Sequence, residues 1–256
     1  MKMIFMGRKA YSAELLEWTA AQGIEIAAVC TDDQFPNSPT AAKAREMQLP
    51  VISMEEAEEL LQSGTEVDLV VSYLYWRKIR KPLIELPKYG CINFHPAILP
   101  DWRGCAGYNI AILNHLSEWG ATVHYVDESI DTGRIIKVAR FPFDADTATV
   151  VTLEKKTQEI QMALYKEVIL AVKEKGILPS VPQEAGAGRY ISRREMEEMK
   201  AIDLAHDTKE MIDRKIRAFW FPPYDGANIT ISGKRYTLVD EGILKTLTPP
   251  DTTSMV

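Results

Sequence analysis

The fold class is decided by residues 3–30, which read MIFMGRKAYSAELLEWTAAQGIEIAAVC. Apolar runs at 3–6 and 24–30 enclose residues 12–21, whose apolar positions recur with helical spacing. Short continuous apolar runs that alternate with amphipathic helices are typical of parallel strands covered on both faces. This stretch therefore predicts an α/β protein with a Rossmann-like, mostly parallel sheet.

The same alternation continues along the chain as far as Gly176. Expected strands lie at 67–71, 91–94, 121–126 and 135–141, and expected helices at 40–47, 55–63, 108–116 and 150–176. Two prolines and two glycines in residues 179–188 then indicate a linker. We therefore expect a first, larger domain over residues 1–180, which the resemblance described below identifies as the catalytic one.

Residues 189–248 are expected to form a small C-terminal α+β domain. Asp207 and Glu210 have capping-box spacing ahead of a helix that runs to Phe219. Residues 228–231 and 236–239 flank a Ser-Gly turn and predict a β-hairpin. The tail from Pro249 is expected to be disordered.

Composition excludes several classes of protein. The 256 residues hold 30 Lys and Arg against 36 Asp and Glu, and a net charge of −6 disfavours a partner bound through nucleic-acid phosphates. Three cysteines without Cys-x-x-Cys spacing disfavour disulfides and thiolate metal sites, and the four histidines show no zinc spacing, so we expect no metal. No signal peptide or membrane-spanning run is apparent, which predicts a cytoplasmic protein without a membrane partner.

Candidate chemistry lies in residues 91–104, CINFHPAILPDWRG. Asn93 and His95 would emerge at the carboxyl end of a parallel strand, where open α/β sheets place their ligands. Pro96 restricts the backbone of His95 to the extended region, which holds the His95 side chain in a fixed position. The alternative is that His95 is a structural histidine with satisfied hydrogen bonds.

A second candidate stretch is residues 120–133, GATVHYVDESIDTG. A carboxylate from this turn near His95 would raise the pKa of the imidazole and fix its tautomer. The alternative is a solvated loop in which Asp131 forms an Asx-turn with the backbone of Gly133.

Together these two stretches resemble the formyltransferases that use 10-formyltetrahydrofolate. The family pattern Asn-x-His-x-x-x-Leu-Pro is present at 93–100, and Asp-x-Gly follows 36 residues after the histidine. The resemblance covers about residues 1–175 and implies catalytic roles for Asn93, His95 and Asp131. Ala97 departs from the commoner serine, a change we expect to be tolerated.

The resemblance also implies that the formyl donor, 10-formyltetrahydrofolate, lies against two segments of the chain. Its folate ring would contact Tyr75, Trp76, Arg77, Ile79, Val126 and Asp127. The alternative for the aromatic residues 73–76 is core packing.

The segment RAFWFPPYDGA, residues 217–227, looks like the C-terminal portion of nucleotide-sugar N-formyltransferases. The expected acceptor is a dTDP-linked dideoxyhexose with a 3- or 4-amino group, and the expected assembly a homodimer. Arg8 and Lys9 would hold its diphosphate, although a solvated turn is the alternative. Trp220, Phe221 and Tyr224 would contact the nucleotide, unless the cluster serves as a docking or dimer contact.

Other acceptors and other functions stay open at this point. Methionyl-tRNA formyltransferases and glycinamide ribonucleotide formyltransferases share the catalytic pattern. The short C-terminal part of mixed charge disfavours tRNA as the acceptor. A formyltetrahydrofolate hydrolase and a non-catalytic folate- or nucleotide-binding module are the remaining alternatives.

Overall fold

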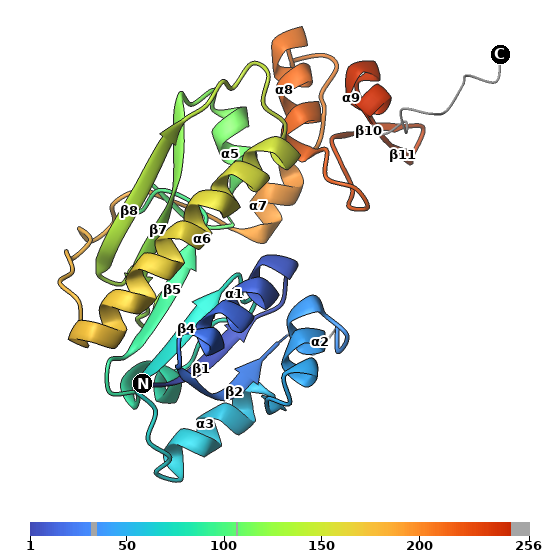
Figure 1. Ribbon diagram of the computed structural model, residues 1–256. Helices are drawn as coiled ribbons and strands as arrows, with labels where there is room; N and C mark the ends of the chain where they lie inside the picture. Colours follow the sequence, from blue (N-terminus) through green and yellow to red (C-terminus); the bar gives the residue numbers. More distant parts are fainter. Residues whose placement is uncertain (32–34, 106, 247–256) are drawn as a thin grey trace. The chain divides into compact units, whose positions relative to one another are not determined.

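A computed structural model describes residues 1–31, 35–105 and 107–246 of the chain (Figure 1). These residues form two compact units, each built from separate stretches. The first unit comprises residues 1–103, 120–140 and 157–189, and the second comprises 104–119, 141–156 and the chain from 190 onward. The predicted domains 1–180 and 189–248 stay a prediction, and the predicted disordered tail from Pro249 lies outside the described residues.

A seven-stranded sheet organises the first unit. Its strands are β1 (Lys2–Gly7), β2 (Glu25–Cys30), β3 (Val51–Ile52), β4 (Leu69–Tyr73), β5 (Cys91–His95), β7 (Glu118–Tyr125) and β8 (Ile135–Pro142). The strand order is β3-β2-β1-β4-β5-β7-β8. Strands β1 to β5 pair in parallel, and β7 is antiparallel to β5. The prediction of a mostly parallel sheet is confirmed.

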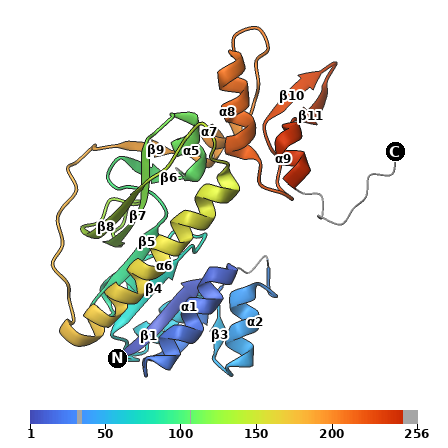
Figure 2. The same ribbon diagram turned by 45° about the horizontal axis from the view of Figure 1, so that its top comes forward.

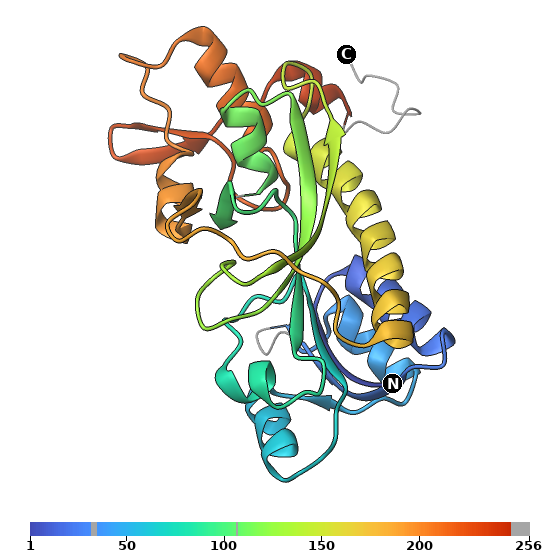
Figure 3. The same cartoon turned by 90° about the vertical axis from the view of Figure 1, so that its left-hand side faces the viewer.

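Helices cover the sheet of the first unit on both faces. They are α1 (Ala10–Ala21), α2 (Pro39–Glu46), α3 (Met54–Gln62), α4 (Lys81–Glu85) and the part of α6 (Val150–Lys175) that belongs to this unit. Helices α1 and α6 lie side by side (Figures 1 and 3) and pack with Phe5, Val71 and Phe94 into one core. Helices α3 and α4 pack against Ile4 and Val70 on the opposite face. Burial on both faces explains why these strands are continuous apolar runs.

The second unit is mainly helical. It contains α5 (Tyr108–Leu113), α7 (Arg193–Glu198), α8 (Lys209–Phe219), α9 (Glu241–Thr246) and a hairpin of β10 (Asn228–Ile231) and β11 (Lys234–Thr237). Short strands β6 (Trp102–Gly104) and β9 (Arg189–Ile191) pair with each other where the chain passes between the units. Among the described helices of the chain, none is long and apolar enough to cross a membrane.

Two local predictions for this unit need correction. Thr208 rather than Asp207 is the N-cap of helix α8, and its side chain accepts a hydrogen bond from the Met211 amide. The carboxylate of Asp207 is instead paired with Lys215 at 2.5 Å. The second hairpin strand begins at residue 234 rather than 236, because the two turn residues have left-handed φ values of 48° and 79°. Such a two-residue turn places Ile231 directly opposite Lys234.

Candidate functional site

Strands β5 and β7 bring two polar side chains together at the carboxyl end of β5. Their antiparallel register pairs Asn93 with His124 and His95 with Thr122. The amide nitrogen Nδ2 of Asn93 lies 3.2 Å from Nε2 of His124. His124 is almost fully buried, so this contact is shielded from water. The pairing makes His124 a member of the site, which the sequence analysis did not identify.

The hydrogen bonds of His124 determine which of its ring nitrogens carries the proton. Nδ1 lies 2.8 Å from the carbonyl oxygen of Tyr125, which can only accept. The neutral ring therefore carries its hydrogen on Nδ1, and Nε2 accepts a hydrogen bond from the Asn93 amide. This contact fixes the side-chain amide of Asn93 with its NH₂ group toward the ring and uses one of the two N–H bonds.

His95 and Asp131 face each other beside this pair. Nε2 of His95 donates to the carbonyl oxygen of Trp102 at 3.0 Å, which leaves Nδ1 directed at the carboxylate of Asp131. The distance from Nδ1 to Oδ2 of Asp131 is 3.6 Å, and Oδ1 of Asp131 lies 3.5 Å from Nε2 of His124. The structure therefore brings the three predicted catalytic residues into one cluster, with His124 as a fourth member.

The backbone around Asp131 is unusual. Asp131 has a φ of +56°, a left-handed conformation that L side chains rarely adopt. At Gly133 a Cβ atom would lie 1.8 Å from the carbonyl oxygen of Tyr125, so only glycine fits there. The Asx-turn is made by Asp127, whose Oδ1 accepts from the Ser129 amide at 3.1 Å. The alternative of a solvated environment for Asp131 is therefore wrong, since its side chain is only 10% exposed and faces the two histidines.

Burial lowers the pKa of His95 below its ordinary value of 6.5, while the negative charge of Asp131 opposes this effect. The neutral imidazole is therefore the favoured form in the folded protein at neutral pH. In the unfolded chain His95 binds a proton near pH 6.5, so lowering the pH further favours the unfolded state.

We expect the free energy of unfolding to fall as the pH drops from about 6.5 through the lower folded-state pKa. Urea unfolding at a series of pH values measures this contribution, and NMR titration of the His95 imidazole measures the pKa directly. A His95→Gln variant is the control, since it lacks the titrating group and should lose this part of the pH dependence. A folded-state pKa above 6.5 for His95 would contradict the assignment.

The predicted folate-contacting residues have different environments. Arg77 forms a two-pronged ion pair with Glu55 at 2.5 and 3.1 Å, which holds the pKa of Glu55 at about 2. Ile79 is buried among core residues behind the sheet. Nε1 of Trp76 is buried and has no hydrogen-bond partner among the described residues. Tyr75 and Val126 are partly buried and pack against the same core. The carboxylate of Asp127 accepts a hydrogen bond from the Ser129 amide within its own turn.

The predicted acceptor-contacting residues belong to separate units. Arg8 and Lys9 precede α1 in the first unit, and Lys9 is the N-cap of that helix. In the second unit, the rings of Phe221 and Tyr224 stack with centroids 5.9 Å apart and an interplanar angle of 16°. Trp220 is the C-cap of α8, and Tyr224 is 69% exposed, which makes its ring available for a partner.

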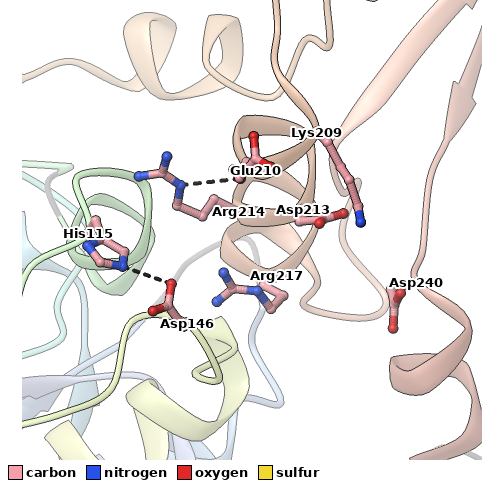
Figure 4. A pocket seen from close by; sticks show the side chains of 8 residues that line it. All are labelled: His115, Asp146, Lys209, Glu210, Asp213, Arg214, Arg217 and Asp240. Carbon is pink, nitrogen blue, oxygen red and sulfur yellow. Dashed lines mark hydrogen bonds and ion pairs between the residues drawn. The ribbon is translucent and has the colours of Figure 1, made fainter.

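The second unit also contains a cavity of about 630 Å³ (Figure 4). None of the predicted site residues lines it. Its wall carries both signs of charge, and Nε2 of His115 lies 2.8 Å from Oδ1 of Asp146. Arg217 donates to two carbonyl oxygens of the segment before α6 and so fixes α8 to that segment. The lining residues are His115, Asp146, Lys209, Glu210, Asp213, Arg214, Arg217 and Asp240.

Comparison with known proteins relates the chain to enzymes that transfer formyl groups. Residues 1–169 match the family model described as Formyl transferase. Methionyl-tRNA formyltransferase from Nitrosospira multiformis is 32% identical over 246 residues, which cover 91% of this chain and 77% of that protein.

Solved structures with the same fold include two N-formyltransferases. A 4-N formyltransferase from Francisella tularensis has a TM-score of 0.78 at 22% identity and covers 94% of this chain and 97% of its own. An N-formyltransferase from Helicobacter canadensis, solved with folinic acid and dTDP-3-aminofucose, has a TM-score of 0.71 at 24% identity and covers 91% of this chain and 85% of its own. These similarities confirm the predicted fold class.

Proposed function

Because the chain belongs to the formyl transferase family, we propose that it formylates the amino group of a nucleotide-linked amino sugar. The predicted family and enzyme class are confirmed, as is 10-formyltetrahydrofolate as the co-substrate. The acceptor and the roles of single residues are our proposal. The observation that carries the reaction is the cluster of Asn93, His95 and Asp131 at the carboxyl end of β5.

In the proposed reaction the acceptor amine attacks the formyl carbon, and the carbonyl oxygen becomes an oxyanion. One N–H of Asn93 faces His124, which directs the second N–H of the same amide toward that oxyanion. The amine must lose a proton, and Nδ1 of His95 can accept it while Asp131 stabilises the resulting imidazolium. The bond from the formyl carbon to the folate nitrogen then breaks, and that nitrogen takes the proton held by His95, which returns the imidazole to its neutral form.

Part of the positive charge of the second unit is engaged in ion pairs, which weakens the case for RNA as the acceptor. Four basic side chains there are each paired with a carboxylate: Arg194 with Glu198, Lys200 with Glu197, Lys215 with Asp207, and Arg235 with Asp225. RNA binding requires basic side chains that are available to neutralise phosphates. The exposed stack of Phe221 and Tyr224 instead offers a flat apolar surface of the kind that binds a nucleotide base. The Helicobacter canadensis enzyme, which was solved with dTDP-3-aminofucose, adds support.

Methionyl-tRNA is the second candidate acceptor, because the relative with 32% identity is a methionyl-tRNA formyltransferase. Both reactions formylate a primary amine with the same donor. The cluster around His95 is therefore compatible with either acceptor.

We expect purified protein to formylate dTDP-linked 3- or 4-amino sugars and to leave methionyl-tRNA unmodified. Mass spectrometry after incubation with 10-formyltetrahydrofolate and each acceptor separately measures this. Tyr224→Ala should raise the KM for the nucleotide sugar by an amount equivalent to about 1–3 kcal/mol, because a stacking surface is lost, and should spare the KM for the folate.

Tyr236→Ala is the matched control, since Tyr236 is a half-exposed tyrosine of the hairpin. Efficient formylation of methionyl-tRNA without formylation of any sugar would overturn the choice of acceptor. It would leave the roles of Asn93, His95 and Asp131 standing. The predicted homodimer and cytoplasmic location stay predictions.

A further inference from the structure

The segment between α6 and β9 (Figure 2), whose composition predicted a linker, is attached to the first unit at several points. Val181 forms an antiparallel bridge with Ile135, with both backbone hydrogen bonds at 2.8 Å. Arg134 donates to the hydroxyl and the carbonyl oxygen of Ser180 at 3.0 and 2.5 Å. We call residues 178–189 the strap.

The far end of the strap is held against the loop that follows His95. Gly188 has a φ of +70°, and a Cβ atom there would lie 1.7 Å from the carbonyl oxygen of Pro100. The amide of Arg189 donates to the carbonyl oxygen of Asp101 at 2.8 Å. The strap therefore contacts both the start of β8, just after the Asp131 turn, and the loop that follows His95.

Between these attachments Gln183 reaches the turn that contains Asp131. Its Nε2 lies 3.1 Å from the carbonyl oxygen of Asp131 and 2.6 Å from that of Gly133. One side-chain amide thus donates to two carbonyl groups on either side of a single residue. Its Oε1 atom is buried and has no hydrogen-bond partner among the residues described. The side chain is therefore held by its two donor contacts.

We propose that Gln183 is a positioning residue, which holds the Asp131 turn in its left-handed conformation and so keeps the carboxylate against His95. The expected effect of Gln183 on catalysis rests on the proposed function. A left-handed φ costs backbone energy in a residue other than glycine, although less in aspartate than in most residues, and contacts that fix the backbone offset this cost. The two hydrogen bonds from Gln183 fix the carbonyl group of the strained residue itself and that of Gly133 two residues later, and thereby supply that constraint.

Gln183→Met tests the proposal, because methionine has similar length and no donor. Its Asp131 turn should relax, and kcat should fall about tenfold with little change in either KM, because only the placement of Asp131 changes. Ser180→Ala is the matched control, since it removes a strap hydrogen bond from Arg134 without touching the Asp131 turn. It should retain wild-type kcat.

Two readouts separate positioning from a general structural role. Asp131 and His124 are the titratable groups that act on His95, and loss of the Asp131 charge lowers its pKa. NMR titration should therefore shift the His95 pKa downward in Gln183→Met, in the same direction as in Asp131→Ala. In a protein that already carries Asp131→Ala, adding Gln183→Met should not lower kcat further, because the two groups act as a unit.

An unchanged His95 titration in folded Gln183→Met would overturn the inference whatever the activity. Additive losses of kcat in the Asp131→Ala, Gln183→Met double variant would also overturn the inference, because a general structural role of Gln183 does not depend on Asp131. If the titration shifts but Asp131→Ala keeps full activity, the proposed catalytic role fails and the positioning role stands.

Discussion

Replacing His95 by alanine is expected to lower kcat by about a hundredfold or more while the protein stays folded. Asn93→Ala and Asp131→Ala should have effects of similar size. The reason is that the oxyanion donor and the proton acceptor act mainly in the transition state, so their loss leaves substrate binding largely intact. Steady-state kinetics with 10-formyltetrahydrofolate and the acceptor, together with circular dichroism, measures both properties.

His115→Ala is the control for this series, because His115 is an exposed histidine of the second unit and is paired with Asp146. It should keep wild-type kcat. The three losses at the site should also be less than additive in combination, since the groups serve one step. Near-native turnover by a folded His95→Ala variant would refute the catalytic assignment.

Gly133→Ala is expected to have the second large effect, again about a hundredfold in kcat. The new methyl group would meet the backbone carbonyl of Tyr125 at 1.8 Å, and a backbone atom at the end of a strand cannot move aside as a side chain can. The turn itself must therefore shift, which carries the Asp131 carboxylate away from His95. Displacement of a reacting group by about 1 Å is enough for a loss of this size.

The matched control is Gly107→Ala, because the nearest atoms to a Cβ there lie at 3.9 Å, an ordinary contact. That variant should be close to wild type in kcat. For Gly133→Ala, overpacking should also lower the free energy of unfolding by about 1–3 kcal/mol. Full activity of Gly133→Ala would show that the turn tolerates displacement and would contradict the role given to its geometry.

Local sequence determined the fold class and much of the candidate site. Apolar runs covered on both faces appear as unbroken hydrophobic stretches, so residues 3–30 predicted the βαβ arrangement correctly. The spacing of Asn93 and His95 on one strand is also a local property, because alternate residues of a strand share a face. The Ser-Gly turn predicted the hairpin because turn chemistry depends on adjacent residues.

Tertiary structure alone decided the rest of the site. His124 joins Asn93 because β5 pairs with β7, and the choice of strand partner depends on the whole sheet rather than on either segment. Gln183 lies 52 residues from Asp131 in sequence, within a segment whose prolines and glycines resemble those of a free linker. Its role follows from hydrogen bonds to carbonyl groups, which every residue possesses, so no side-chain pattern marks the residues that it holds.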